Sequence, residues 1–250
     1  MSDLCDDLGT RLRLTRPAQR VLSLVPSLTE ALASAHPERV VGATQWCTHP
    51  ADLETSRVRG TKNPNIGSIV ALRPDLVVAN KEENRAIDVQ RLRKAHVPVW
   101  VTDIRTVPQA VRSMQRLFDV ALKWKRPTWL TEAEALWCGD LPPVTSRVAI
   151  AIWRDPWMVV GSDTFTGDLI RRLGWDNAYA DHQLRYPTVD LEELDASDLD
   201  AVVLPDEPYP FRKQDGPEAF ARARTQLISG RLLTWYGPSL VDPALRDLMV

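Results

Sequence analysis

Polar and aromatic side chains recur directly after the predicted strands of this 250-residue chain. Tryptophan rings offer broad stacking surfaces, while lysine and arginine pair with acidic groups of a ligand. Because ligands sit outside the carboxyl ends of strands in open α/β sheets, this repeated placement indicates a binding cleft. The candidate ligand-binding residues are Trp46, Lys62, Asn63, Asn80, Glu82, Glu83, Arg85, Arg105, Trp153, Arg154, Trp157, Glu207, Trp235 and Tyr236.

Cys47 and His49 are the candidate metal ligands, because a Cys-x-His spacing can place a thiolate and an imidazole on one side of a loop. A stable zinc site takes four ligands, and Glu82, Glu83 and His182 complete one only if folding brings them together. The competing interpretation is a buried cysteine followed by a structural histidine. We favour that interpretation and keep the metal site as the alternative.

Acid–base chemistry is the second possibility for the same residues. Glu82 and Glu83 are neighbouring carboxylates, although the nearby Arg85 favours an ion-paired rim over a catalytic pair. The glycine-flanked loop 161–167 precedes a predicted helix, but it lacks the P-loop lysine and the G-x-G-x-x-G pattern. Neither a G-x-S-x-G nor an H-E-x-x-H motif occurs. The catalytic residues of an enzyme therefore stay unknown.

Strands and helices alternate along most of the chain. The run 76–79 is continuously apolar, which is typical of a parallel strand buried on both faces, and Pro74 ends the helix before it. The first half predicts strands at 20–25, 40–44, 75–79 and 97–101, and helices at 66–71, 86–95 and 106–121. The second half predicts strands at 147–153, 158–160, 201–204 and 232–234, and helices at 168–173, 191–194, 217–228 and 243–249.

The alternation pauses at 123–143, where one helix is expected near 128–138. This pattern predicts an α/β fold of two small Rossmann-like lobes with parallel sheets, joined by a bridging helix. The expected boundaries are an N-terminal lobe at 1–122, the bridging helix at 123–143 and a C-terminal lobe at 144–250. Strand ends from both lobes would then line a cleft between them.

Composition limits the partners and the compartment. The formal net charge is -2 and no basic stripe with interleaved aromatics occurs, so nucleic acid is not an expected partner. No apolar run approaches the ~20 residues that cross a bilayer, so membrane insertion is not expected. The first 20 residues show neither a signal peptide nor a lipid-anchor motif, and three cysteines fit a reducing compartment. We therefore expect a cytoplasmic protein.

Five segments together resemble a known family. They are VLSLVPSLTEAL, VVGAT, GTKNPNIGSIVALRPDLVVAN, GSDTFTGDLIRRLGWDNAYA and YPTVDLEELDASDLDAVVLP. They resemble the cobalamin- and siderophore-binding proteins of ABC importers, the helical-backbone metal receptors, over about residues 20–245. The resemblance implies a class III periplasmic-binding-protein-like fold and a ligand sandwiched by aromatic side chains.

The function that this resemblance implies is binding of a corrinoid, haem-like or other metal chelate, with no cofactor required for catalysis. Two alternatives stay open: an enzyme that reuses the cleft, and a true importer subunit. In the family, glutamates at the lobe tips dock onto the transporter. Gly67 stands where the first is expected and Glu192 is the candidate for the second, so we expect docking to a permease to be doubtful.

Overall fold

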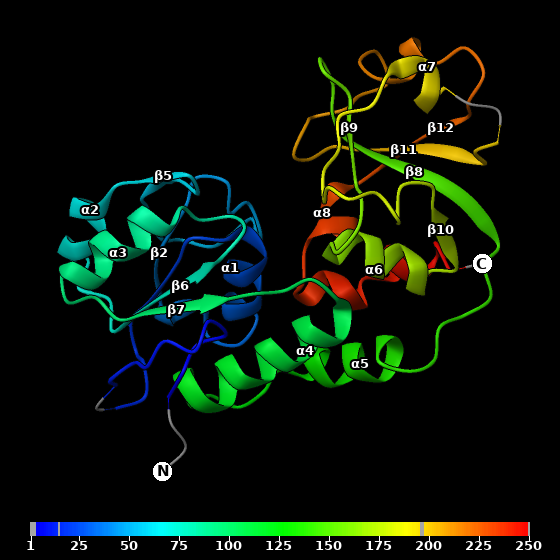
Figure 1. The fold of residues 1–250 in the computed structure, drawn as a ribbon. Helices are drawn as coiled ribbons and strands as arrows, with labels where there is room; N and C mark the ends of the chain where they lie inside the picture. The colour runs from blue at the N-terminus through cyan, green and yellow to red at the C-terminus, as the bar shows by residue number, and fades with distance from the viewer. Residues whose placement is uncertain (1–3, 15, 196–197, 250) are drawn as a thin grey trace. The chain divides into compact units, whose positions relative to one another are not determined.

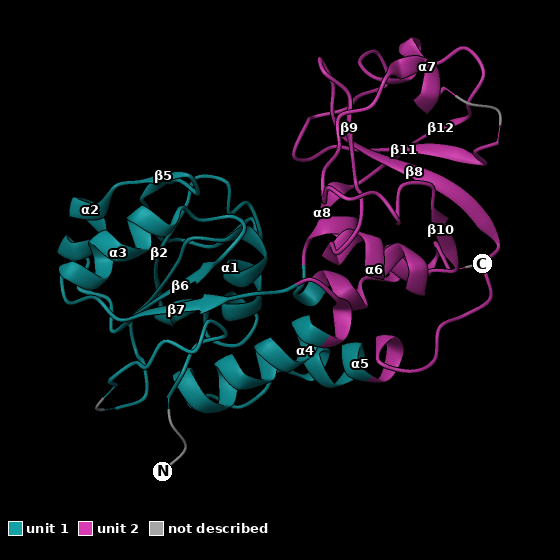
Figure 2. Cartoon of the chain, viewed as in Figure 1, with its two compact units in different colours: residues 1–104, 109–134, 236–238 teal, residues 105–108, 135–235, 239–250 magenta. Residues whose placement is uncertain are grey.

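The computed structural model describes residues 4–14, 16–195 and 198–249. The chain divides into two compact units, shown in teal and magenta in Figure 2. Unit 1 holds residues 1–104, 109–134 and 236–238, and unit 2 holds residues 105–108, 135–235 and 239–250. The lobe boundaries expected from the sequence, at residues 122 and 143, stay predictions.

Unit 1 is built on a five-stranded parallel sheet in the order β3-β2-β1-β6-β7. Its strands β2, β6 and β7 are labelled in Figure 1. Its strands are β1 (Val21–Ser23), β2 (Val40–Ala43), β3 (Ser56–Arg57), β6 (Leu76–Asn80) and β7 (Val99–Thr102). A small antiparallel pair, β4 (Arg59–Gly60) and β5 (Asn63–Pro64), lies beside it. The parallel sheet expected for the first half is therefore present, with three short additional strands.

Every second residue of the central strands of unit 1 points into one core. Leu22, Val77 and Val99 pack there with apolar residues of α2 (Ile66–Ala71) and α3 (Ala86–Lys94). This is the period-2 burial expected of strands. The remaining helix of the sheet, α1 (Pro26–Ala33), follows β1 directly, and a 3₁₀ turn at Pro37–Arg39 leads into β2.

The predicted helix over 106–121 is present as α4 (Val107–Arg116), which continues as a π-helix over Leu117–Leu122. Lys123 ends it in the left-handed conformation. The second helix of this region, α5 (Thr128–Trp137), lies where the bridging helix was expected. Within the described ranges, no helix combines the length and the apolar character that crossing a membrane requires.

Unit 2 carries a second parallel sheet in the order β10-β8-β11-β12, with β9 antiparallel to β8. The strands are β8 (Ser146–Trp153), β9 (Met158–Val159), β10 (Trp175–Asn177), β11 (Ala201–Pro205) and β12 (Thr225–Ile228). The helices are α6 (Phe165–Arg172), α7 (Leu191–Leu194), α8 (Gly230–Thr234) and α9 (Pro243–Arg246), with 3₁₀ turns at Pro217–Ala219 and Pro238–Val241.

Two predicted elements of unit 2 are wrong. The helix expected at 217–228 is a short 3₁₀ turn followed by β12, and the strand expected at 232–234 is the helix α8. The Asp195 carboxylate accepts the backbone N–H groups of Ala221, Arg222 and Ala223, at 2.7–3.2 Å. The carboxylate holds these residues in a loop, and the chain continues from that loop into β12.

Candidate functional site

The carboxyl ends of β1, β2 and β6 lie side by side in unit 1, because these strands are parallel and adjacent. Asn84, in the loop after β6, connects the segment after β1 with the β4–β5 turn. Its amide nitrogen donates to the Leu24 carbonyl at 3.2 Å and to the Thr61 carbonyl at 3.1 Å. The Lys62 ammonium donates to the Glu82 carbonyl at 2.6 Å. The structure thus brings Lys62 and the loop 80–84 together, while their contact with a ligand stays a prediction.

Asn80 has an internal role that differs from the predicted ligand contact. Asn80 is buried, and its side-chain oxygen accepts hydrogen bonds from the backbone N–H groups of Glu82 and Glu83. Its side-chain amide nitrogen donates to the Thr102 hydroxyl at 3.1 Å. Asn84 accepts the backbone N–H of Asn80 at 2.8 Å. All polar atoms of the Asn80 side chain therefore shape the turn, an Asx-turn arrangement.

Glu83 and Tyr236 form a hydrogen-bonded pair at this edge of unit 1. The buried Tyr236 hydroxyl donates to Glu83 Oε1 at 3.0 Å. Burial, and then the Glu83 charge, raise the pKa of Tyr236 well above its ordinary value. At neutral pH the tyrosine is therefore a donor that holds Glu83.

The expected ion-paired rim of Glu82, Glu83 and Arg85 is not formed by Arg85. Its guanidinium pairs with Asp88, one helical turn onward, at 2.8 Å. Asp88 is buried and pairs with Arg91 as well. Arg85 therefore stabilises the start of α3.

Trp46 is 59% exposed beside the β4–β5 turn. A Cβ added at Gly60 would lie 3.2 Å from the Trp46 indole nitrogen and 2.5 Å from the side-chain oxygen of Asn63. Asn63 uses that oxygen to accept the Gly60 N–H at 3.2 Å. Asn63 therefore shapes the turn, while the Trp46 ring stays open to a ligand.

Cys47 and His49 do not form the predicted metal pair. Cys47 is fully buried, with its sulfur 3.0 Å from Thr29 Oγ1 and 3.1 Å from Thr44 Oγ1, and burial raises the pKa of its thiol. His49 is exposed and contacts Thr48 through Nδ1 at 3.0 Å. Within the described ranges, no three His, Cys, Asp or Glu side chains are grouped to hold a metal. A buried, protonated thiol is a poor metal ligand and a poor nucleophile.

In unit 2, the predicted site residue Trp157 is part of the core. Its ring is buried and stacks on Phe211 at 5.8 Å between centroids. The Arg154 guanidinium lies over the same ring and pairs with Asp215 and with Glu218, the latter at 2.7 Å. These contacts stabilise the loop after β11 and pair the arginine with two carboxylates. Neither Trp157 nor Arg154 is therefore available to a ligand.

Trp153 is the aromatic side chain of unit 2 that stays open. It ends β8, is 43% exposed, and meets Tyr209 edge-on at 5.5 Å. The Tyr209 hydroxyl donates to Asp215 at 2.9 Å. The position of the Trp153 ring is therefore supported by the same ion-pair network that holds Arg154.

Three further predicted residues of unit 2 also have partners. Trp235 is buried and its indole N–H donates to Glu207 Oε2 at 3.3 Å. Burial, the largest cause, raises the pKa of Glu207. The Arg105 guanidinium pairs with Asp163.

The sequence analysis did not identify Asn84, nor the two carboxylates Asp215 and Glu218 that pair with Arg154. Asn84 lies in the polar run that was singled out, but no signal separates it from its neighbours. Glu218 lies near the start of the segment 217–228 that was expected to be a helix, and Asp215 lies just before that segment. Their role depends on Arg154, about 60 residues away in the chain, and such a pairing leaves no local signal.

The sequence of this chain was compared with protein-family models and with proteins of known name. No family model matches the chain. It is 26% identical over 193 residues to a vitamin B12-binding protein of Salmonella typhi, covering 75% of this chain and 72% of the relative. It is 24% identical over 256 residues to an uncharacterised ABC transporter substrate-binding lipoprotein, YvrC, of Bacillus subtilis, covering 95% and 81%.

Among solved structures, a periplasmic haem-binding protein from Pseudomonas aeruginosa superposes with a TM-score of 0.74 at 22% identity, covering 93% of this chain and 91% of that one. The likeness confirms the class III α/β fold that was expected from the sequence. The two relatives confirm the resemblance to substrate-binding proteins of importers, and they give no support to the expected doubt about docking.

Proposed function

We propose that this chain, a homologue of the vitamin B12-binding proteins, is a binding protein for a corrinoid, haem-like or other metal chelate. Such a molecule is held as a ligand and not as a catalytic cofactor. The Salmonella typhi relative is named for binding vitamin B12, and the Pseudomonas aeruginosa structure is named for binding haem. Both ligands are large, flat macrocycles, which bind best to aromatic side chains with open faces.

One observation carries the proposal: each unit leaves one large tryptophan exposed at the carboxyl end of a parallel strand. Trp46 follows β2 in unit 1 and Trp153 ends β8 in unit 2. An indole ring with an open face offers stacking area to a flat macrocyclic ligand. The other predicted tryptophans, Trp157 and Trp235, are buried and support the unit from inside.

Lys62 supplies the charge that an acidic chelate requires. It is exposed, and its recorded partner is the neutral Glu82 carbonyl, whereas Arg85, Arg105 and Arg154 each pair with a carboxylate. Its full positive charge therefore remains available. We expect Lys62 to contribute more to the binding of haem, which carries two carboxylates, than to the binding of cobalamin, whose side chains are largely amides.

The test is isothermal titration calorimetry with cyanocobalamin and, separately, with haemin. Trp46→Ala and Trp153→Ala should each weaken the chelate that binds by about tenfold, since an aromatic stacking contact contributes about 1 kcal/mol beyond its buried area. Leu184→Ala, which removes an exposed apolar side chain elsewhere in unit 2, should leave affinity unchanged. Failure of both chelates to bind the wild-type protein contradicts the proposal.

A second candidate function rests on the Bacillus subtilis relative, which is named as an ABC transporter lipoprotein. A subunit that delivers its ligand to a permease works outside the cytoplasm. The cytoplasmic location expected from the N-terminal sequence fits a carrier or storage protein instead, and we retain it as a proposal. Fractionation of the native organism, with detection by antibody, separates the two: recovery outside the cytoplasm favours delivery to a permease.

A further inference from the structure

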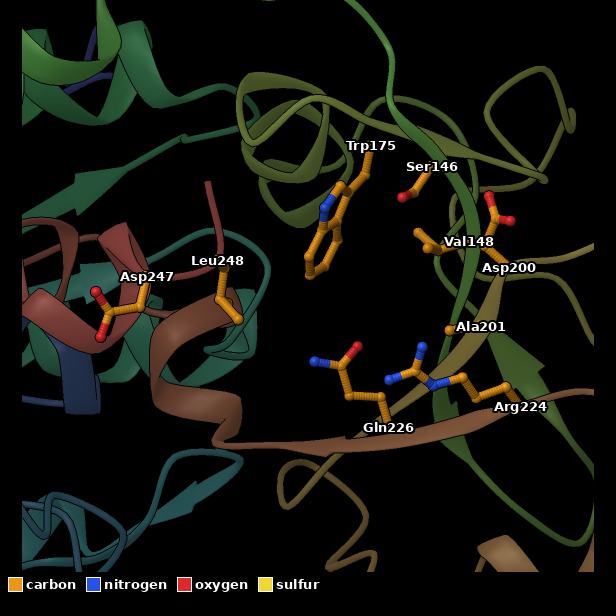
Figure 3. A pocket seen from close by; sticks show the side chains of 9 residues that line it. All are labelled: Ser146, Val148, Trp175, Asp200, Ala201, Arg224, Gln226, Asp247 and Leu248. Atoms are coloured by element: carbon orange, nitrogen blue, oxygen red, sulfur yellow. The ribbon is translucent and has the colours of Figure 1, made fainter. Parts of the chain in front are cut away.

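A hollow of about 210 Å³ lies at the amino ends of the parallel strands of unit 2, the edge opposite to the strand ends discussed above (Figure 3). It is lined by Ser146, Val148, Trp175, Asp200, Ala201, Arg224, Gln226, Asp247 and Leu248. Drug-sized ligands occupy pockets of about 300–1,000 Å³. The hollow is therefore too small for a corrinoid or a haem and suits a ligand of a few heavy atoms.

The strand residues of the lining all belong to one face of the sheet. Trp175 is in register with Ser146, and Ala201 with Val148. Gln226 is in register with Val203, two residues after Ala201, and so shares that face. The segment after α9 supplies Leu248 on the side of Trp175 (Figure 3). Val148, Ala201 and the 5%-exposed Trp175 give the hollow an apolar floor and wall.

Some polar side chains of the hollow have hydrogen-bond partners within the protein, and others do not. Arg224 and Gln226 lie next to each other with their polar ends at one side of the hollow (Figure 3). In the part of the chain that the structure describes, neither side chain makes a hydrogen bond or ion pair, although the Arg224 carbonyl accepts from Val202. Asp200 accepts the Arg147 N–H at 2.7 Å, and the Asp247 carboxylate is turned away from the hollow.

We propose that this hollow binds a small organic carboxylate with a compact apolar body. The Arg224 guanidinium and the Gln226 amide would donate to the carboxylate, since a guanidinium matches the two oxygens of that group. The apolar body would pack on Trp175, Val148 and Leu248. This proposal goes beyond chelate binding and does not depend on it, because the two sites share no residue.

The probe is 4-methylpentanoate, and its neutral amide, 4-methylpentanamide, is the matched control with the same body. The measurement is the shift of the Trp175 indole N–H resonance in a nitrogen–proton correlation spectrum of the full chain, assigned with Trp175→Phe. We expect a saturable shift with the carboxylate. Binding of the amide should be about tenfold weaker or more, since the charge-assisted hydrogen bonds are lost.

Arg224→Ala should weaken binding of the carboxylate at least tenfold and leave binding of the amide unchanged. Arg212→Ala, an exposed arginine outside the hollow, should affect neither. The proposal is overturned if the wild-type protein shows no saturable shift at millimolar 4-methylpentanoate, if the amide binds equally well, or if Arg224→Ala binds as the wild type does. Binding of cyanocobalamin or haemin by Arg224→Ala reports on the chelate proposal separately.

Discussion

Glu207 carries a carboxyl group whose ionisation is opposed by its surroundings. Burial raises its pKa above the ordinary value of 4.5, and the nearby Asp206 adds to the effect. A raised folded-state pKa contributes stability that is complete below the unfolded pKa and is lost as pH rises through the folded pKa. We therefore expect Glu207→Gln, which stays neutral and can still accept from Trp235, to gain stability relative to wild type as pH rises.

The check is urea denaturation at about pH 4 and about pH 7, in the range where glutamate ionises. The difference in free energy of unfolding, variant minus wild type, should be larger at the higher pH. Glu192→Gln, at an exposed position, serves as the matched control for the substitution itself. An equal difference for Glu207→Gln at both pH values would show that burial does not control this carboxyl group.

Asn84 makes three hydrogen bonds from a buried position, one to each of three chain segments. Asn84→Ala leaves the Asn80 N–H and two carbonyl groups without their partner, and we expect a loss of about 2–3 kcal/mol in the free energy of unfolding. Chemical denaturation measures it. Asn63→Ala removes one bond at an exposed turn and should cost about 1 kcal/mol or less. Equal losses for the two variants would contradict the role given to Asn84.

At the residue scale, the sequence named candidate site residues but did not show which of them have internal partners. The rule that ligands meet strand ends placed Trp46, Lys62 and Trp153 where the structure leaves them accessible. That rule could not show that the Asn80 side chain donates a hydrogen bond to Thr102, or that the Trp157 ring stacks on Phe211. Those partners are about 20 and 50 residues away, and only the folded chain brings them together.

At the scale of elements, the segment before β1 protects the edge strand β7. The Asp6 side chain is fully buried, and its carboxylate accepts hydrogen bonds from the backbone N–H groups of Leu8 and Thr10. The same carboxylate also accepts from the Arg93 guanidinium at 2.9 Å and from the Val101 N–H at 3.4 Å. The Asp7 N–H donates to the Val101 carbonyl at 3.1 Å. The segment thus covers an edge that would otherwise expose unpaired backbone groups.

We expect Asp6→Ala to lower the free energy of unfolding by about 3 kcal/mol, because it removes the carboxylate partner of Arg93 and the acceptor of the N-terminal turn. Hydrogen exchange of the Val101 amide should also be faster in the Asp6→Ala variant than in the wild-type protein. Asp52→Ala, at an exposed position of the same unit, is the control and should change neither quantity. Unchanged exchange at Val101 in Asp6→Ala would mean that the segment is not what protects β7.

The elements themselves were largely predictable where apolar residues repeat with a clear period. The helix at Ile66–Ala71 and the apolar strand Leu76–Asn80 follow directly from such patterns. The segment 217–228 is rich in helix-forming alanine and arginine, and its local preference indicated a helix. Capture of its N–H groups by Asp195 outweighs that preference, a tertiary effect that propensity does not contain.

At the scale of the whole molecule, unit 1 is not contiguous in the chain. Residues 236–238 belong to it, although the residues before and after them belong to unit 2. Tyr236 is buried there against Glu83, and Gly237 packs so closely that an added Cβ would lie 2.9 Å from the Ser27 carbonyl oxygen. A fragment of residues 1–134 therefore lacks a side chain that its own fold requires.

We expect unit 1 in that fragment to be less stable than in the intact chain, and Tyr236→Ala in the intact chain to reproduce the loss. Truncating a buried aromatic side chain costs about 3 kcal/mol or more, so the exchange protection of β1 and β6 amides should fall about a hundredfold. Tyr236→Phe keeps the ring, loses one hydrogen bond and should cost about 1 kcal/mol. If the fragment and the intact chain protect those amides equally, the returning segment is dispensable and unit 1 folds from its first 134 residues alone.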